Sequence, residues 1–183
     1  MNTGNSVLLT YVAPFLQQVL HFAVSGVGFM MLALGVSGIV GSRLGGYGVD
    51  RWGTVRLLTG SLLALAVSLA MLPLTVSPAV VGAAWMVVWM VSLFMYAPAL
   101  QTYFIQQAPA SSNAVLSVNL SVIHLGIALG AGIGGVVVDK ASTVLYHPWI
   151  ASGLALLGLV AALYSFASRK RPAVSGLKPE SSP

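Results

Sequence analysis

The sequence predicts an all-α membrane protein with six transmembrane helices, and three observations support this prediction. First, 57% of the 183 residues are hydrophobic and only 6% are charged, whereas soluble domains carry about 25% charged residues. Second, the mean hydropathy is +0.93. Third, long apolar stretches alternate with short polar or proline-containing breaks. A surface in contact with lipid needs no charged cover, so a bilayer-embedded bundle accounts for all three.

Candidate spans are the apolar stretches that approach the length of a transmembrane helix, about 20 residues. They are 7–19, 26–47, 57–74, 79–104, 113–138 and 149–167. The first is short. A turn separates the third and fourth spans between Pro73 and Pro78, because proline disfavours helix at its own position and just before it. We expect one bundle over 1–168 and a disordered basic cytoplasmic tail over 169–183, which is polar and rich in Pro and Ser.

Basic residues indicate how the spans are oriented. Arg43, Arg51 and Arg56 lie in or beside the loop between the second and third spans, and four of the eight Lys and Arg residues lie in the tail. Short loops rich in Lys and Arg stay in the cytoplasm. With six spans, both termini are then cytoplasmic, and we expect a bacterial-type inner membrane. This distribution does not form a phosphate-binding face, so no nucleic-acid partner is expected.

The loop after the second span carries the most specific pattern in the chain, G-x3-D-R-x-G-x2-R. Its fixed positions are Gly46, Asp50, Arg51, Gly53 and Arg56. Gly46 would permit close helix approach and Gly53 a tight turn. The carboxylate at position 50 can accept backbone N–H bonds or pair with a cation, while the two arginines hold the loop in the cytoplasm. The pattern resembles the signature loop of the major facilitator superfamily, which joins the second and third helices of a half.

Two other regions strengthen this resemblance. Residues 9–16 look like the seventh helix, and residues 117–135 look like the eleventh helix, of the drug/proton-antiporter branch that includes arabinose-efflux-like permeases. The match is to the C-terminal six-helix half only. It implies one half of a twelve-span fold, built as a 3+3 inverted repeat. It also implies alternating-access efflux of a drug, sugar or metabolite, with the signature loop acting in gating. Proton coupling is implied by the resemblance alone.

Small and polar residues mark the fifth predicted span. Gly126, Gly130 and Gly134 recur every four residues, a stripe that favours close helix packing. A set of polar residues shares one helical face, and it would look into the bundle interior or a water-filled path, because exposure to lipid is costly. Its members are Asn113, Ser117, Ser121 and His124. The histidine can relay protons or hydrogen-bond a substrate; the alternative is a neutral side chain bonded to a neighbouring helix.

The first span contributes further candidates for a substrate path. By resemblance these are Tyr11, Pro14, Gln17 and Gln18. Pro14 also frees a backbone carbonyl one turn earlier and so favours a hinge. Packing accounts for these residues equally well.

The sequence leaves two functional classes open and argues against a third. One is a transporter half that needs a lipid bilayer, a small-molecule substrate and a second six-helix half, either an N-terminal half or another copy of this chain. The other is a truncated, non-transporting remnant or a small membrane scaffold. An enzyme is not expected, because the three histidines lie in different segments without Asp or Glu at ligand-like spacing. No metal or cofactor is expected.

Overall fold

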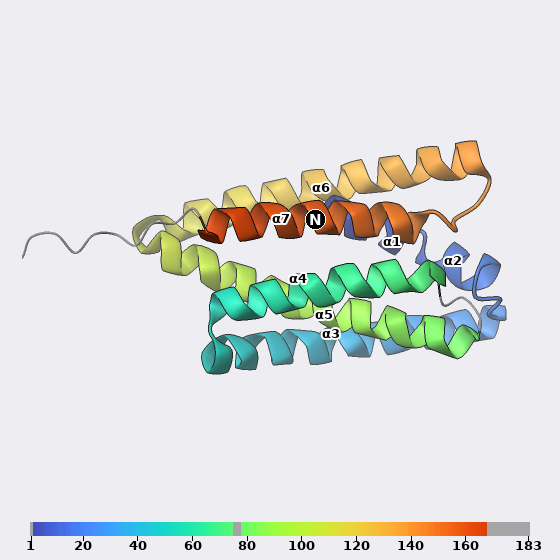
Figure 1. The fold of residues 1–183 in the computed structure, drawn as a ribbon, viewed down its shortest axis with the longest axis horizontal. Helices are drawn as coiled ribbons and strands as arrows, with labels where there is room; N and C mark the ends of the chain where they lie inside the picture. The colour runs from blue at the N-terminus through green and yellow to red at the C-terminus, as the bar shows by residue number, and fades with distance from the viewer. Residues whose placement is uncertain (1, 75–77, 168–183) are drawn as a thin grey trace, which may run out of the picture.

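The computed structural model describes residues 2–74 and 78–167, and these residues form an elongated bundle of helices (Figure 1). The predicted tail, 169–183, lies outside the described residues. The helices are α1 (Asn2–Leu9), α2 (Val12–Gln18), α3 (Val24–Trp52), α4 (Thr54–Met71), α5 (Ala79–Gln107), α6 (Ser112–Ala141) and α7 (His147–Ala167). Single 3₁₀ turns follow α4 at Leu72–Leu74 and precede α6 at Pro109–Ser111.

In the described part of the chain, five helices are long and apolar enough to cross a membrane. They are 24–52, 54–74, 79–107, 109–141 and 147–165. The prediction of an all-helical bundle is therefore confirmed, and each of these five candidate spans overlaps one predicted span.

The first predicted span, 7–19, is not one helix, so six spans are not confirmed. It is instead two short helices, α1 and α2, which Thr10 and Tyr11 separate. The interruption falls one turn before Pro14. Proline has no amide hydrogen and its ring collides with the carbonyl group four residues earlier, here that of Thr10, which explains why the helix ends there.

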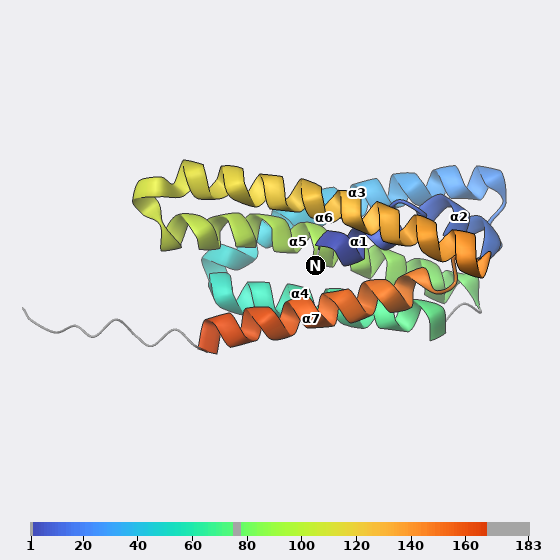
Figure 2. The ribbon, with the colours of Figure 1, turned by 90° about the horizontal axis from the view of Figure 1, so that it is seen from above.

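The packing follows the order α3, α5, α4, α7, α1, α6 (Figures 1 and 2). Helix α5 packs against both α3 and α4, α7 packs against α4 and α1, and α1 packs against α6. Fully buried side chains at the centre come from the short helices as well as the long ones, among them Phe15, Leu65 and Trp89. Most of α6 is exposed, so one long helix stands at the edge of the bundle with little cover.

The closest approach of α3 to α5 occurs at glycines. A Cβ on Gly41 would meet the carbonyl oxygen of Val91, and a Cβ on Gly45 would lie 2.6 Å from the carbonyl oxygen of Met95. Gly46, which we expected to permit such an approach, does not serve this purpose, because a Cβ there would have no atom within 4 Å. The glycines that let the backbones of α3 and α5 meet are therefore Gly45 and Gly41, which lie one residue and five residues before Gly46.

Candidate functional site

The turn between α3 and α4 is as short as a helix reversal can be. Gly53 alone separates Trp52 from Thr54, with φ +83° and ψ 152°. This conformation is open almost only to glycine, because a Cβ would collide with the backbone. Its amide donates to the carbonyl oxygen of Val49 (3.0 Å) and its carbonyl oxygen accepts from the amide of Leu57 (3.2 Å). One residue thus ends one helix and begins the next.

The charged residues of the signature loop are all exposed at this end of the bundle. Arg51 donates from Nη1 to the hydroxyl of Tyr47 (2.8 Å), and its guanidinium carbon lies 5.9 Å from the centroid of that ring. Within residues 2–74 and 78–167 no ion pair to Asp50 is recorded. The carboxylate is therefore available to a partner outside this bundle, and the gating role of Gly46, Asp50, Arg51, Gly53 and Arg56 stays a prediction.

The glycine stripe of α6 lies against α1. A Cβ on Gly126 would lie 3.2 Å from the Cβ of Asn2, and a Cβ on Gly130 would meet the carbonyl oxygen of Thr3. Between these two positions the hydroxyl of Ser6 donates to the carbonyl oxygen of Ile127 (2.9 Å). Because the glycines carry no side chain, the backbone of α1 can approach closely enough for this bond to form.

The polar face of α6 lies on the opposite side of the helix from these glycines. Ser117 and Gly126 are nine residues apart, which is two and a half turns at about 3.6 residues per turn. All four predicted residues, Asn113, Ser117, Ser121 and His124, are exposed. This face therefore does not look into the bundle interior, which was one of the two expected positions.

These polar groups are bonded only along their own helix. Ser117 and Ser121 donate to carbonyl oxygens four residues earlier, at 2.9 and 3.2 Å. His124 Nδ1 lies 2.9 Å from the carbonyl oxygen of Leu120. Such bonds satisfy one polar atom of each side chain, but they do not cover the face.

The predicted residues of the first span are divided between two places. Tyr11 is half-buried, its ring 4.8 Å from that of His147 between centroids, and its hydroxyl donates to the carbonyl oxygen of Ala131 (3.5 Å). Gln17 and Gln18 are exposed at the end of α2. Tyr11 thus lies on the glycine side of α6, away from the polar face with which the sequence grouped it.

Two buried polar side chains connect helices in the core: His147 links the start of α7 to α6, and Trp89 links α5 to α1. His147 is fully buried, with Nδ1 3.1 Å from the carbonyl oxygen of Val144 and Nε2 3.1 Å from that of Gly134. The indole nitrogen of Trp89 donates to Asn5 Oδ1 (3.0 Å) in the core. The contacts of His147 with Gly134 and of Trp89 with Asn5 could not be found from the sequence, because each joins helices whose relative position only packing determines.

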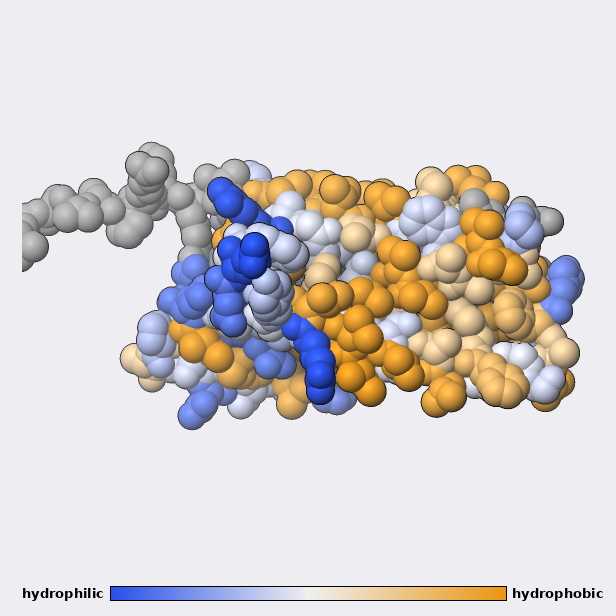
Figure 3. Space-filling model, turned by 90° about the horizontal axis from the view of Figure 1, so that it is seen from below, coloured by the Kyte–Doolittle hydropathy of each residue, from blue (hydrophilic) through white to orange (hydrophobic). Residues whose placement is uncertain are grey.

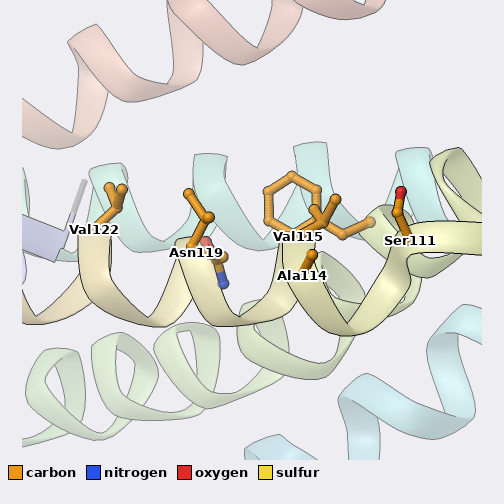
Figure 4. A pocket seen from close by; sticks show the side chains of 7 residues that line it. Ser111, Ala114, Val115, Asn119 and Val122 are labelled. Atoms are coloured by element: carbon orange, nitrogen blue, oxygen red, sulfur yellow. The ribbon is translucent and has the colours of Figure 1, made fainter.

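Two neighbouring cavities lie beside α6 and share the side chain of Asn119. One, of about 220 Å³, lies between α1, α5 and α6, and its polar side chains include Asn2, Gln101 and Asn119. The other, of about 460 Å³, extends towards Phe104 and Ser111, with its side chains along α6 shown in Figure 4. No charged residue lines either one. The sequence did not identify Asn119 as a residue of the substrate path. Asn119 shares a helical face with Gly126 and not with the polar residues Asn113, Ser117, Ser121 and His124.

The described residues contain no group of three or more His, Asp or Glu side chains that could hold a metal ion. The two cavities beside α6 are lined by carboxamides, hydroxyl groups and apolar side chains. They can bind an uncharged molecule by hydrogen bonds and apolar contact.

The apolar helices and the cavities lined by α6 fit an integral membrane protein built as a helical bundle. The sequence profile of the Major Facilitator Superfamily matches residues 1–182. The chain belongs to this superfamily. Its relatives are transporters, so the expectation that it is not an enzyme is confirmed by its family.

Curated relatives agree with this assignment. The uncharacterized MFS-type transporter YbcL of Bacillus subtilis is 28% identical over 174 residues, which cover 95% of this chain and 44% of the relative. The inner membrane transport protein YdhP of Escherichia coli is 33% identical over 165 residues, covering 90% and 42%. The purine ribonucleoside efflux pump NepI of Escherichia coli is 27% identical over 155 residues, covering 84% and 38%. The chain thus spans less than half the length of these relatives.

Proposed function

We propose that this chain forms one six-helix half of a secondary transporter that exports a small molecule by alternating access. Its superfamily membership supports transport in general, and a relative is named as an efflux pump. The coverage of less than half of each relative fits a half. In this proposal α1 and α2 together are the first helix of a 3+3 inverted repeat.

The observation that carries the proposal is the exposed polar face of α6, Asn113, Ser117, Ser121 and His124. Polar side chains at membrane depth face protein or water, because lipid cannot satisfy them. A second six-helix half, either an N-terminal half or another copy of this chain, would cover that face. The water-filled path would then run between the two halves. The exposed Gln17 and Gln18 remain candidates for its end, whereas Tyr11 packs on the other side of α6 and Pro14 interrupts the first span.

The cavities favour an uncharged substrate with hydrogen-bonding groups and an apolar body. Asn2, Gln101 and Asn119 offer both donors and acceptors beside aromatic side chains. A drug, a sugar or a metabolite would satisfy these conditions, and purine ribonucleosides, which NepI is named for exporting, are a natural first test. Coupling to protons rests on family analogy. The described carboxylates, Asp50 and Asp139, lie in the last turns of their helices, so a buried acidic site would have to come from the other half.

The signature-loop end would serve as a cytoplasmic latch. Asp50, Arg51 and Arg56 are exposed there and can form ion pairs with the second half when the cytoplasmic side closes. From the same positive charge we infer that this end faces the cytoplasm of a bacterial-type inner membrane, and we propose that both termini lie on that side.

Export from cells expressing the native, full-length product tests the path. Asn119→Leu preserves side-chain volume but removes the carboxamide, and we expect it to lower export of an accepted uncharged substrate by about tenfold, the loss that about 1.4 kcal/mol of binding would cause. Leu157→Val, on the exposed side of α7, is the matched control. Export unchanged by Asn119→Leu would reject these cavities as the path.

Reconstitution tests the requirement for a second half. Uphill transport by a demonstrated monomer of this chain in liposomes would refute that requirement. Absence of any transport, with every candidate partner present, would favour the alternative of a non-transporting remnant or scaffold.

A further inference from the structure

A groove opens on the outer surface where α3 and α4 meet. Both helices pack on α5 much more than on one another. They touch beside the turn, where a Cβ on Gly48 would lie 2.8 Å from Leu57 Cδ1. Next to this contact lies a cavity of about 350 Å³, lined by Trp52 of α3, by Arg56, Gly60 and Ser61 of α4, and by Met95 of α5.

A second cavity, of about 460 Å³, adjoins the first at the signature-loop end. It shares Trp52 and Arg56 with the first cavity, and it also contacts Thr54 and Gln106. The hydroxyl of Thr54 donates to Gln106 Oε1 (3.1 Å), which fixes the carboxamide at the cavity wall. The two cavities therefore form one site with a polar compartment at the helix ends and an apolar compartment along α4.

Arg56 supplies an uncompensated positive charge where the compartments join. It is exposed, and within residues 2–74 and 78–167 no ion pair to its guanidinium is recorded. Arg51 differs, because the hydroxyl and ring of Tyr47 already contact it. Figure 3 shows strongly hydrophilic residues gathered at one end of the molecule, directly beside apolar surface. The site itself combines the Arg56 guanidinium with the apolar side chains of Trp52, Leu57 and Met95.

The wall of the apolar compartment continues along an exposed strip of α4. Gly60, Leu63 and Val67 lie one helical turn apart, and all three are exposed. A Cβ on Gly60 would have no atom within 4 Å. This open strip runs from Arg56 along the helix, and it is the shape that a hydrocarbon chain parallel to α4 would occupy.

We propose that these joined cavities bind an anionic phospholipid. Its phosphate lies against Arg56 and Gln106, the ring of Trp52 lies at the level of the glycerol backbone, and one acyl chain follows Gly60 and Leu63. Basic pockets between transmembrane helices bind anionic headgroups, and tryptophan favours the depth of the headgroups. A free phosphate ion would occupy the polar compartment only, so the chemistry shared by both ligands is a phosphate at Arg56.

Lipid retention by the purified full chain tests the proposal. The protein in detergent is titrated with phosphatidylglycerol or phosphatidylcholine, and bound lipid is counted by native mass spectrometry. We expect a preference for phosphatidylglycerol, which Arg56→Gln lowers by about fivefold, since one basic side chain at an anionic surface contributes on the order of 1 kcal/mol. Arg43→Gln removes the same charge from a position that lines neither cavity, and it should keep the preference.

Gly60→Leu separates a lipid from a free anion. A Cβ at this position would have no atom within 4 Å, and we expect the rest of the leucine side chain to occupy the open strip. The substitution should therefore reduce lipid retention while leaving competition by inorganic phosphate unchanged. Equal retention of the two lipids by the unmodified chain, or equal losses in Arg56→Gln and Arg43→Gln, would overturn the proposal. Saturation by inorganic phosphate, with lipid retention unaffected by Gly60→Leu, would replace the lipid with a free anion.

Discussion

Replacing Gly130 by alanine adds one Cβ where α6 lies closest to α1. That atom would meet the carbonyl oxygen of Thr3 and would lie 2.7 Å from the Cβ of Ser6. A backbone carbonyl group cannot rotate away as the end of a long side chain can, so α1 must move off α6. Such a shift stretches the bond from the Ser6 hydroxyl to the carbonyl oxygen of Ile127. Overpacking a close contact costs about 1–3 kcal/mol.

Thermal unfolding of the detergent-purified chain, followed by size-exclusion chromatography with fluorescence detection, measures this loss. At about 2–4 °C per kcal/mol for a chain of this length, the midpoint should fall on the order of 5 °C. Gly132→Ala is the control, because a Cβ there would have no atom within 4 Å, and it should leave the midpoint unchanged or raise it slightly. Equal midpoints for the two variants would refute the close approach of α1 to α6.

Three further substitutions test the turn, the buried polar contact and the helix interruption. Gly53→Ala forces a side chain into a backbone conformation with φ +83° and should lower the free energy of unfolding by about 1–3 kcal/mol. Gly60→Ala is the control, and a thermal midpoint of Gly53→Ala no lower than that of Gly60→Ala would contradict this expectation. Trp89→Phe leaves Asn5 Oδ1 without its donor and should destabilise the chain by about 1–3 kcal/mol. Unfolding in SDS measures this loss, and an unchanged unfolding transition would count against the hydrogen bond. Pro14→Ala restores an amide donor, so spin-label distances across 7–19 should fit one continuous helix, and unchanged distances would show that proline is not the cause of the break.

The spans were predictable from the sequence because they depend on local composition. Burying the backbone in lipid requires helices of about 20 apolar residues, and the observed α3, α4, α5, α6 and α7 each overlap one predicted stretch. The turn at Gly53 was also predictable, because it too depends on local sequence: few residues other than glycine tolerate its backbone conformation.

The partners of the small and polar residues were not predictable. The sequence grouped Tyr11 with the polar residues of α6 only as candidates for one substrate path, whereas in the structure it packs against Gly134 and His147. Periodicity identifies which residues share a face, but it does not say which helix that face meets. His147 shows the same limit, since its partner at Gly134 is thirteen residues earlier and lies across a turn.

The sequence by itself determined that this protein is a helical membrane protein, where its long helices run and which turn requires glycine. Hydrophobic length and backbone sterics act over one to two dozen neighbouring residues, so they can be read in order along the chain. The tertiary structure decided that the glycines of α6 meet α1, and that the polar face beyond them has no cover in this bundle. These outcomes depend on how whole helices fit together, and that fit is a property of all their side chains at once.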